Sequence, residues 1–220
     1  MIKYVLFDLD GTLLSTIDTI TYHLNSALES HSLGRITVED AKAFIGNGAR
    51  KLVERALLKN GISDGDTVAK ILLEYNRAYD SDPLPLTYPY DGIADLVDDL
   101  YNSGIKLAVV TNKPEPTARK LIEHFFYGKI DIVSGGRTGA VLKPDPTESR
   151  RVLSALGGEA SECAFVGDTY VDIETGKNMG AALTVGVTWG FRSREELTGA
   201  GADFIADCPE QILSAIRKQI

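Results

Sequence analysis

The chemically most informative residues are two aspartates, Asp8 and Asp10, which follow the apolar run 4–7. If that run is a strand, the two side chains lie on the same side of the chain, at the strand end where open α/β folds bind their ligands. Two carboxylates held that close repel each other unless a cation lies between them, and Mg²⁺ prefers carboxylate, carbonyl and water oxygens. A lone Asp-x-Asp is also common in solvated turns. We interpret Asp8 and Asp10 as part of a phosphoryl-transfer site. This interpretation depends on further polar residues later in the chain.

One group of partners follows the apolar run 105–110, in the segment Thr111-Asn112-Lys113-Pro114. A helix is expected to begin near Pro114. A hydroxyl and successive backbone N–H groups beside a helix N-terminus suit a phosphate oxygen. Thr111 and Asn112 are therefore candidate substrate-binding residues, and the alternative is that Thr111 only caps the helix.

Lys143, Asp168 and Asp172 complete the set. Lys143 precedes Pro144, which restricts the backbone so that the lysine can be directed at an anionic centre, and the alternative is an ordinary surface lysine. Asp168 follows the apolar run 164–166 and is a candidate metal ligand. Asp172, four residues later, is expected either to contact the metal ligands without binding the metal itself or to cap the next helix.

The elements that must position these residues alternate between short apolar runs and helical patterns. The runs are expected to be buried strands, and they cover residues 4–7, 105–110, 130–133, 164–166 and 183–187. Apolar residues between them recur at helical spacing. Such alternation predicts an α/β fold with a doubly wound parallel sheet, a Rossmann-like core, and it places each candidate residue at a strand end.

One interval breaks the alternation, because Thr111 lies 98 positions after Leu13. A strand-helix-strand crossover needs only a dozen or more residues. The interval carries several helical patterns and ends in the Pro-rich segment 81–92, so we expect an inserted α-helical cap. The predicted boundaries are residues 1–14 and 88–220 for the core and 15–87 for the cap. Both linkers start from one place in the sheet, which puts the cap over Asp8 and Asp10 as a lid.

Composition limits the classes of partner. The chain has 220 residues, of which 44% are hydrophobic and 25% charged, and a net charge of −8. This acidic balance argues against nucleic-acid and anionic-membrane binding. No apolar run approaches the length needed to span a bilayer, and two cysteines do not form a disulfide framework, so a cytoplasmic location is expected.

These motifs together resemble the haloacid dehalogenase superfamily, specifically its phosphoglycolate-phosphatase-like members with a helical cap. The resemblance rests on Asp8-x-Asp10-Gly11-Thr12, Thr111-Asn112-Lys113, Lys143-Pro144 and Gly167-Asp168-x3-Asp172. It implies a Mg²⁺-dependent phosphomonoester hydrolase acting on a small anionic phosphorylated substrate through an aspartyl-phosphate intermediate.

The resemblance also implies a role for each residue. Asp8 would be the nucleophile, and Asp10 would protonate the leaving group and then deprotonate the attacking water. Thr111 and Lys143 would hold the transferred phosphoryl group. The metal ligands would be Asp8, the backbone carbonyl of Asp10, and Asp168. Because dehalogenases of the superfamily lack the second aspartate and phosphonate-cleaving members carry a different residue there, Asp10 disfavours cleavage of C–Cl or C–P bonds.

Two features bear on the substrate. The segment Gly46-Asn47-Gly48-Ala49-Arg50 resembles the cap loop that faces the active site in this family. Gly48 and Arg50 are therefore expected to contact substrate, with Arg50 pairing with a carboxylate such as that of phosphoglycolate; the alternative is a solvated arginine. After Gly-Thr-Leu the family commonly has an Asp-Ser pair, whereas in this chain Leu14 is followed by Ser15-Thr16.

Two other functions stay open at this level. A phosphomutase of the β-phosphoglucomutase type shares the core and the cap, although its cap must exclude water from the acyl phosphate. A non-catalytic phospho-acceptor module also uses a strand-end aspartate, a threonine and a lysine, but it lacks an inserted lid. The sequence is compatible with either a monomer or a homodimer.

Overall fold

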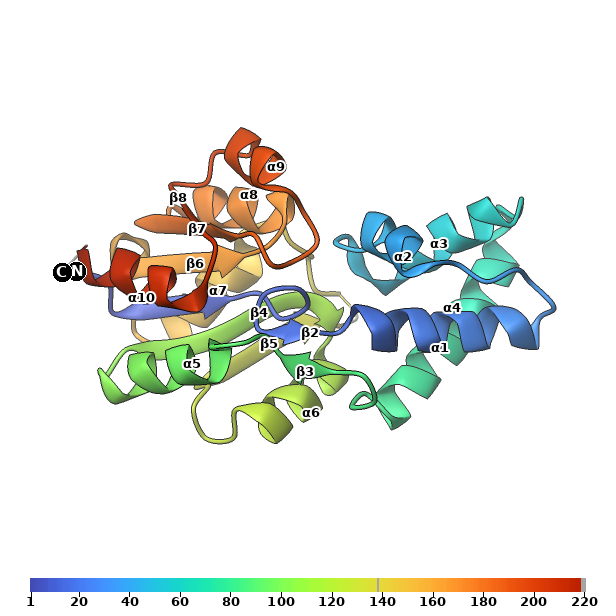
Figure 1. Cartoon of the computed structure of the whole chain (residues 1–220), viewed down its shortest axis with the longest axis horizontal. Coiled ribbons are helices and arrows are strands. Elements are labelled where there is room, and N and C mark those ends of the chain that lie inside the picture. Colours follow the sequence, from blue (N-terminus) through green and yellow to red (C-terminus); the bar gives the residue numbers. More distant parts are fainter. Residues whose placement is uncertain (138, 219–220) are drawn as a thin grey trace.

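A six-stranded sheet forms the body of the protein, and four helices form a second body beside it (Figure 1). The computed structural model describes residues 1–137 and 139–218. All neighbouring strands of the large sheet run parallel, in the order β5-β4-β1-β6-β7-β8. The strands are β1 (Tyr4–Phe7), β4 (Lys106–Pro114), β5 (Ile132–Gly136), β6 (Cys163–Gly167), β7 (Leu183–Val187) and β8 (Phe204–Ala206). This confirms the predicted α/β core with a doubly wound parallel sheet.

The position of β1 decides where the site lies. It pairs with β4 on one side and with β6 on the other, although these strands are far apart in the sequence. The strand order therefore reverses at β1. In open α/β sheets, a reversal of this kind leaves a crevice at the carboxyl ends of the strands, and ligands bind there.

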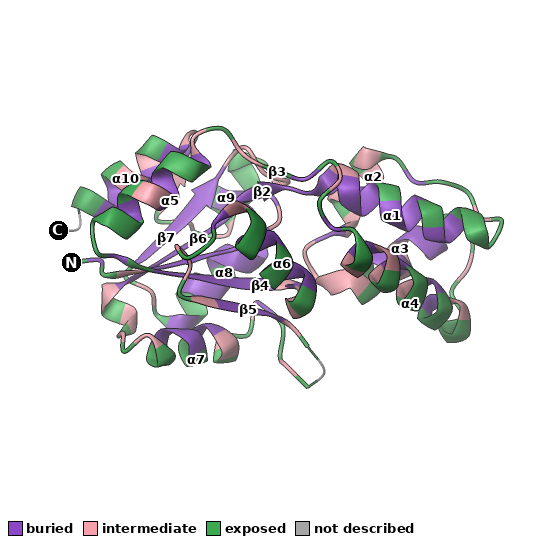
Figure 2. Ribbon diagram, turned by 90° about the horizontal axis from the view of Figure 1, so that it is seen from below, coloured by how far each residue is buried: buried purple, intermediate pink, exposed green. Residues whose placement is uncertain are grey.

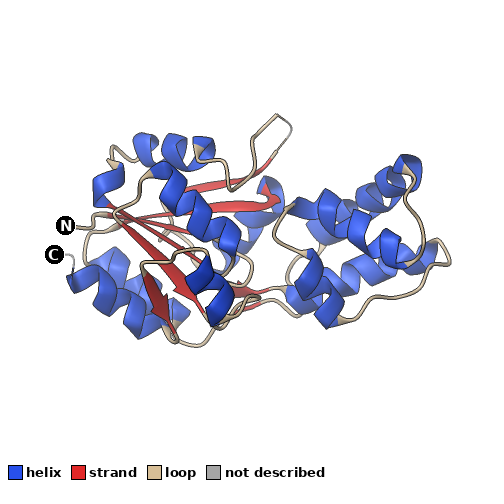
Figure 3. Cartoon of the chain, turned by 90° about the horizontal axis from the view of Figure 1, so that it is seen from above, coloured by secondary structure: helices blue, strands red, loops and turns tan. Residues whose placement is uncertain are grey.

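Helices cover both faces of the sheet (Figure 3). Because successive side chains of a strand point to opposite faces, Val5 and Phe7 pack in one hydrophobic cluster and Leu6 in another. The first cluster includes α5 (Ile93–Asn102), α6 (Glu115–Phe125) and α10 (Pro209–Lys218), and the second includes α7 (Thr147–Ala155) and α8 (Tyr170–Met179). A 3-10 turn η1 (Ala160–Glu162) and the short α9 (Arg194–Gly199) complete the core.

Figure 2 shows the strands buried along most of their length, as expected for a sheet covered on both faces.

The second body is the helical cap. It consists of α1 (Ile17–Ser30), α2 (Val38–Phe44), α3 (Gly48–Lys59) and α4 (Gly65–Ser81). The cap has a hydrophobic core of its own, in which Leu24, Leu57 and Ile71 are fully buried. Thr37 starts α2 with a reciprocal capping box to Asp40. This satisfies backbone N–H groups that the helix leaves unpaired.

The chain enters and leaves the cap at one place. The strands β2 (Leu14–Ser15) and β3 (Tyr88–Pro89) pair antiparallel, with Leu14 opposite Pro89 and Ser15 opposite Tyr88. The two linkers therefore lie side by side, as the connectivity predicts. The pattern of apolar runs did not predict this small ladder or the edge strand β8, because two or three residues are too few to establish a period. The domain boundaries after residues 14 and 87 stay predictions.

Within the described residues, no helix combines the length and the apolar character that a membrane span requires.

Candidate active site

Asp8 is held at the carboxyl end of β1 by a buried lysine. Its Oδ1 lies 2.7 Å from Nζ of Lys143, and the same Nζ lies 2.6 Å from Oδ1 of Asp172. All three side chains are almost completely buried. Asp172 accepts two further hydrogen bonds at Oδ2, from the backbone N–H and the hydroxyl of Thr169, at the start of α8. Asp172 thus caps the helix and anchors Lys143 beside Asp8.

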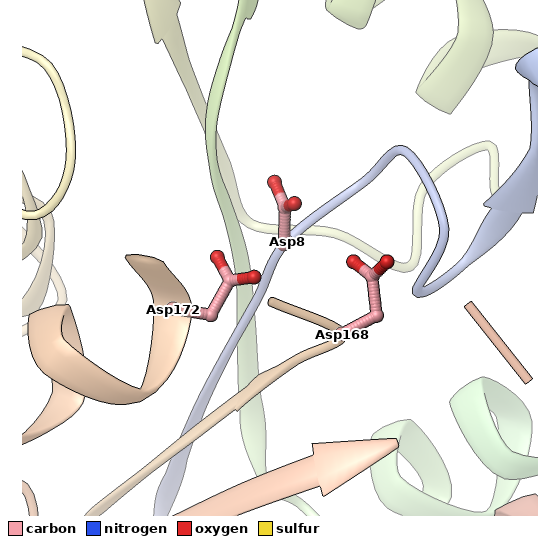
Figure 4. Close-up of side chains that lie close together, drawn as sticks. All are labelled: Asp8, Asp168 and Asp172. Carbon is pink, nitrogen blue, oxygen red and sulfur yellow. The ribbon is translucent and has the colours of Figure 1, made fainter. Parts of the chain in front are cut away.

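Asp168 completes a cluster of three buried carboxylates with Asp8 and Asp172. One oxygen from each lies within 4.8 Å of the others, and Figure 4 shows the three side chains close together, carried by the segment after β1, the end of β6 and α8. Asp168 accepts hydrogen bonds from the hydroxyl of Thr12 at 3.1 Å and from the N–H of Phe191 at 2.8 Å. The Asp-x-Asp segment passes very close: a Cβ added at Gly11 would lie 2.3 Å from Oδ2 of Asp168, and glycine also suits the positive φ of +85° there.

The donor set fits a divalent cation. Three carboxylates and one ammonium leave a formal charge of −2 when all are ionised. The Lys143 ammonium offsets only one of the three negative charges. A hard divalent cation, which takes carboxylate oxygens as ligands, would balance the rest.

Burial sets the electrostatics of the cluster. It raises the pKa of Asp8 to about 6, an effect that Lys143 opposes and Asp172 reinforces. It also raises the pKa of Asp168 well above its usual value, with Asp172 and Asp8 adding to the rise. For Lys143, burial acts to lower the pKa, but the attraction of Asp172 and Asp8 outweighs it and raises the pKa above the usual range. Lys143 therefore stays charged at neutral pH.

Thr111 and Asn112 lie in β4, next to β1. The Thr111 side chain is buried and lines a cavity between core and cap. The amide of Asn112 bridges two segments. It accepts a hydrogen bond from the N–H of Lys143 at 2.9 Å and donates to the carbonyls of Lys143 at 3.1 Å and Gly46 at 3.0 Å. Asn112 thus connects the loop of the buried lysine to the cap loop.

Asp10 lines the cavity and makes an ion pair that the sequence analysis did not foresee. Nζ of Lys113 lies 3.0 and 3.3 Å from the two carboxylate oxygens of Asp10 and donates to the hydroxyl of Tyr79 at 2.6 Å. The side chain of Lys113 is only 2% exposed. Burial lowers its pKa, and the neighbouring Asp10 opposes that change. Since Tyr79 belongs to α4, this contact connects the acid-base candidate directly to the cap.

The structure places the two cap-loop candidates differently. Gly48 begins α3 and lines the cavity. Arg50 lies on the outside of the cap, where its side chain is 60% exposed and pairs with Glu54 at 3.0 Å. The described residues that line the cavity do not include Arg50. The structure therefore does not bring Arg50 to the site, because residues two apart on a helix point in different directions.

Tyr79 and Lys113 are thus site residues that the sequence analysis missed. A signal for Lys113 was present: side chains two apart in a strand point to the same side, so Lys113 shares the side of Thr111. Tyr79 had no comparable signal. Its helical spacing predicts core packing, and only the position of the cap against the sheet brings its hydroxyl to Lys113.

Comparison with known proteins shows the family and the fold of this chain. The family model described as haloacid dehalogenase-like hydrolase matches residues 5–185. A phosphoglycolate phosphatase of Rhodospirillum rubrum is 37% identical, over 94% of this chain and 88% of the relative, and phosphoglycolate phosphatase 1 of Pseudomonas aeruginosa is 34% identical, over 95% and 80%. A crystal structure from Lactobacillus delbrueckii subsp. bulgaricus superposes with a TM-score of 0.92 at 33% identity, covering 97% of this chain and 98% of the other.

The chain belongs to the haloacid dehalogenase-like hydrolases. Within that family it is a phosphoric monoester hydrolase.

Proposed function

We propose that this protein hydrolyses phosphoglycolate, or a closely similar small phosphomonoester with a carboxylate, in a Mg²⁺-dependent reaction through an aspartyl-phosphate. The observation that carries the proposal is the arrangement of Asp8. Its carboxylate lies 2.7 Å from Lys143, inside a cluster of acidic groups that suits a metal, and Asp10, two residues on, lines the adjoining cavity.

Each residue has a defined task in this proposal. Asp8 attacks phosphorus and forms an acyl phosphate while the alcohol leaves. Asp10 protonates the departing ester oxygen and then takes a proton from the water that attacks the acyl phosphate. Lys143 and Thr111 hold the phosphoryl oxygens as charge builds up on them.

Asp8, the backbone carbonyl of Asp10, and Asp168 would hold the Mg²⁺ ion, with Asp172 behind them. When bound, the ion neutralises negative charge between nucleophile and substrate, which otherwise repel each other. Gly48 and Asn112 are proposed to shape the side of the cavity toward the cap.

The cavity and the relatives support the choice of substrate. The cavity is partly enclosed, because cap residues line it opposite Asp10 of the core. A partly enclosed cavity between two bodies suits a small molecule and not a polymer. Curated relatives of similar length and 34–37% identity are phosphoglycolate phosphatases. We also propose that the reaction takes place in the cytoplasm.

A panel of small phosphomonoesters tests the proposal. With Mg²⁺, the protein should release phosphate from phosphoglycolate faster than from neutral alkyl phosphates or glucose phosphates, and should leave glucose phosphates unisomerised. Asp8→Asn keeps the side-chain volume but removes the nucleophile, so turnover should fall on the order of 10⁴-fold or more. Asp98→Asn, a change of the same type in α5 of the core, should have no such effect.

Appreciable turnover by a clean preparation of Asp8→Asn would remove Asp8 from the nucleophile role. Isomerisation of a glucose phosphate would support a phosphomutase instead. Formation of a phosphoprotein without turnover would indicate a phospho-acceptor module.

A further inference from the structure

The cavity between core and cap has an unusual charge distribution. Among the described residues that line it, Lys113 is the one cation and Asp10 the one anion, and most of the others are apolar or uncharged. The protein as a whole carries a net charge of −8. The negative charge of a substrate that enters this cavity must therefore be balanced by a nearby cation. Among the described lining residues, that cation is Lys113.

Lys113 is oriented by groups from both bodies of the protein. Asp10 of the core and Tyr79 of the cap both accept hydrogen bonds from its ammonium. An ammonium group has three N–H donors. One donates to Tyr79, and the contacts to the two Asp10 oxygens, at 3.0 and 3.3 Å, fit a single N–H shared by both oxygens, which leaves the third donor for a further acceptor. Burial of the side chain removes competing water from that donor and restricts its direction.

The chemistry of the proposed substrate puts its carboxylate near this donor. In phosphoglycolate one methylene separates the ester oxygen from the carboxylate carbon. Because Asp10 must reach that ester oxygen to protonate it, the carboxylate has to lie within a few bond lengths of Asp10. Without a cation there, two carboxylates would face each other in a poorly hydrated cavity, which is costly.

We infer that Lys113 is the residue that recognises the carboxylate of the substrate, with Tyr79 holding its ammonium in position. This inference rests on the proposed function and deepens it: the substrate class is a phosphomonoester with an anionic group one methylene beyond the ester oxygen. Lys113 contacts both the acid-base residue and the leaving group. Selectivity for the leaving group therefore depends on cap closure, because Tyr79, which holds the Lys113 ammonium, belongs to the cap.

Arg50 is the competing candidate for the same task. Its side chain is exposed and pairs with Glu54, and the described residues that line the cavity do not include it. To reach a substrate beside Asp10, it would have to leave that pair and cross the wall of the cavity, whereas Lys113 is already in place.

A binding experiment separates recognition from catalysis. The probes are 3-phosphonopropionate, in which a methylene replaces the ester oxygen of phosphoglycolate, and propylphosphonate, which lacks the carboxylate. Neither can be hydrolysed at the C–P bond by this chemistry. In the presence of Mg²⁺, the wild type should bind 3-phosphonopropionate more tightly. In Lys113→Met this preference should shrink roughly 10- to 100-fold, the usual effect of losing a hydrogen bond to a charged group.

Lys106→Met is the matched control. Lys106 lies at the other end of the same strand and pairs with Asp131 at the surface, so its replacement should leave the preference unchanged. Thermal unfolding checks that each variant is folded, and Lys113→Gln supplies a polar replacement if Lys113→Met is unstable. In turnover assays Lys113→Met should lose more kcat/KM for phosphoglycolate than for ethyl phosphate.

The outcomes are distinct. An unchanged ratio of the two dissociation constants in folded Lys113→Met, with equal loss of kcat for both esters, would show that Lys113 only positions Asp10 and would overturn the inference. Loss of the preference in Arg50→Ala but not in Lys113→Met would assign the carboxylate to Arg50. Wild-type protein without any phosphoglycolate turnover would refute the proposed function itself.

Discussion

Asn112 and Lys143 are joined by two hydrogen bonds: the side-chain oxygen of Asn112 accepts from the backbone N–H of Lys143, and its NH₂ group donates to the carbonyl of Lys143. The amide thereby fixes the backbone from which the Lys143 ammonium reaches Asp8. Since the same NH₂ group also donates to Gly46 of the cap loop, one side chain links two sequence-distant segments at the site.

Replacing Asn112 by alanine should therefore misplace Lys143 without removing it. Two hydrogen bonds to a loop backbone are lost, and a misplacement of about 1 Å can cost a factor on the order of 10² in rate. We expect kcat to fall by that order while the melting temperature changes little. Steady-state kinetics with phosphoglycolate measure the first effect and calorimetry the second. Asn178→Ala is the control, because Asn178 contacts the same loop only at the Pro144 carbonyl.

Asp10→Asn should slow both the formation and the hydrolysis of the phosphoenzyme, by roughly 10²- to 10⁴-fold, as expected when a general acid-base is removed. The loss in the first step should be smaller for an aryl phosphate than for an alkyl phosphate, since a good leaving group needs less protonation. Rapid-quench measurement of phosphoenzyme formation with both esters tests this. Equal losses for the two would argue against Asp10 as the acid.

Metal binding should stabilise the protein, and more so as the pH rises. Burial raises the pKa of Asp8 from 3.8 to about 6, so the native state without metal keeps this proton longer than the unfolded chain does. Without metal, the Asp8 carboxyl therefore adds to the free energy of unfolding below about pH 4, and this contribution is lost as the pH rises through about 6. A metal needs the ionised form, so its stabilisation should grow over the same range.

Thermal unfolding with and without Mg²⁺ measures this effect. Metal at about 100 times its Kd contributes about 2.7 kcal/mol, or roughly 5–10 °C in Tm for a chain of this size. The shift should be larger at pH 7.5 than at pH 5 and should be lost in Asp168→Asn but kept in Asp98→Asn. A shift that is independent of pH and of Asp168 would place the metal elsewhere.

Arg192 should hold the cap against the core. Its guanidinium donates to the carbonyls of Lys42 at 2.7 Å and Ile45 at 3.1 Å, at the end of α2, and the side chain is only 12% exposed. Hydrogen bonds from charged donors contribute about 1.5–3 kcal/mol each when well shielded. Arg192→Met should therefore shift the population away from the closed form and raise KM more than it lowers kcat.

Hydrogen exchange reports the position of the cap. With Mg²⁺ and a phosphoryl mimic such as beryllium fluoride, amides of residues 46–50 should gain protection in the wild type and gain less in Arg192→Met. Arg194→Met is the matched control, because Arg194 pairs with Asp207 within the core. If the cap loop gains no protection at saturating mimic in the wild type, the phosphoryl group alone does not drive closure.

The sequence by itself determined the core and the polar groups at its edge. Alternating apolar runs and helical patterns predict a parallel sheet, and because connections in such a sheet are short and regular, Asp8, Thr111 and Asp168 must meet at one edge. The length between Leu13 and Thr111 likewise required an inserted module. These conclusions depend only on the spacing of apolar residues and on the order of the predicted elements, and both can be read directly from the sequence.

Tertiary structure decided which side chains face one another across the two bodies. Tyr79 reaches Lys113 and Arg192 reaches α2 only because the cap lies against the core, and the orientation of a packed body depends on contacts from many distant residues. The same applies to Arg50, whose helix turns it outward to Glu54. The sequence identified the residues that can do the chemistry. Strand register directs Lys113 to the cavity, whereas the packing of the cap brings Tyr79 to it and leaves Arg50 exposed beside Glu54.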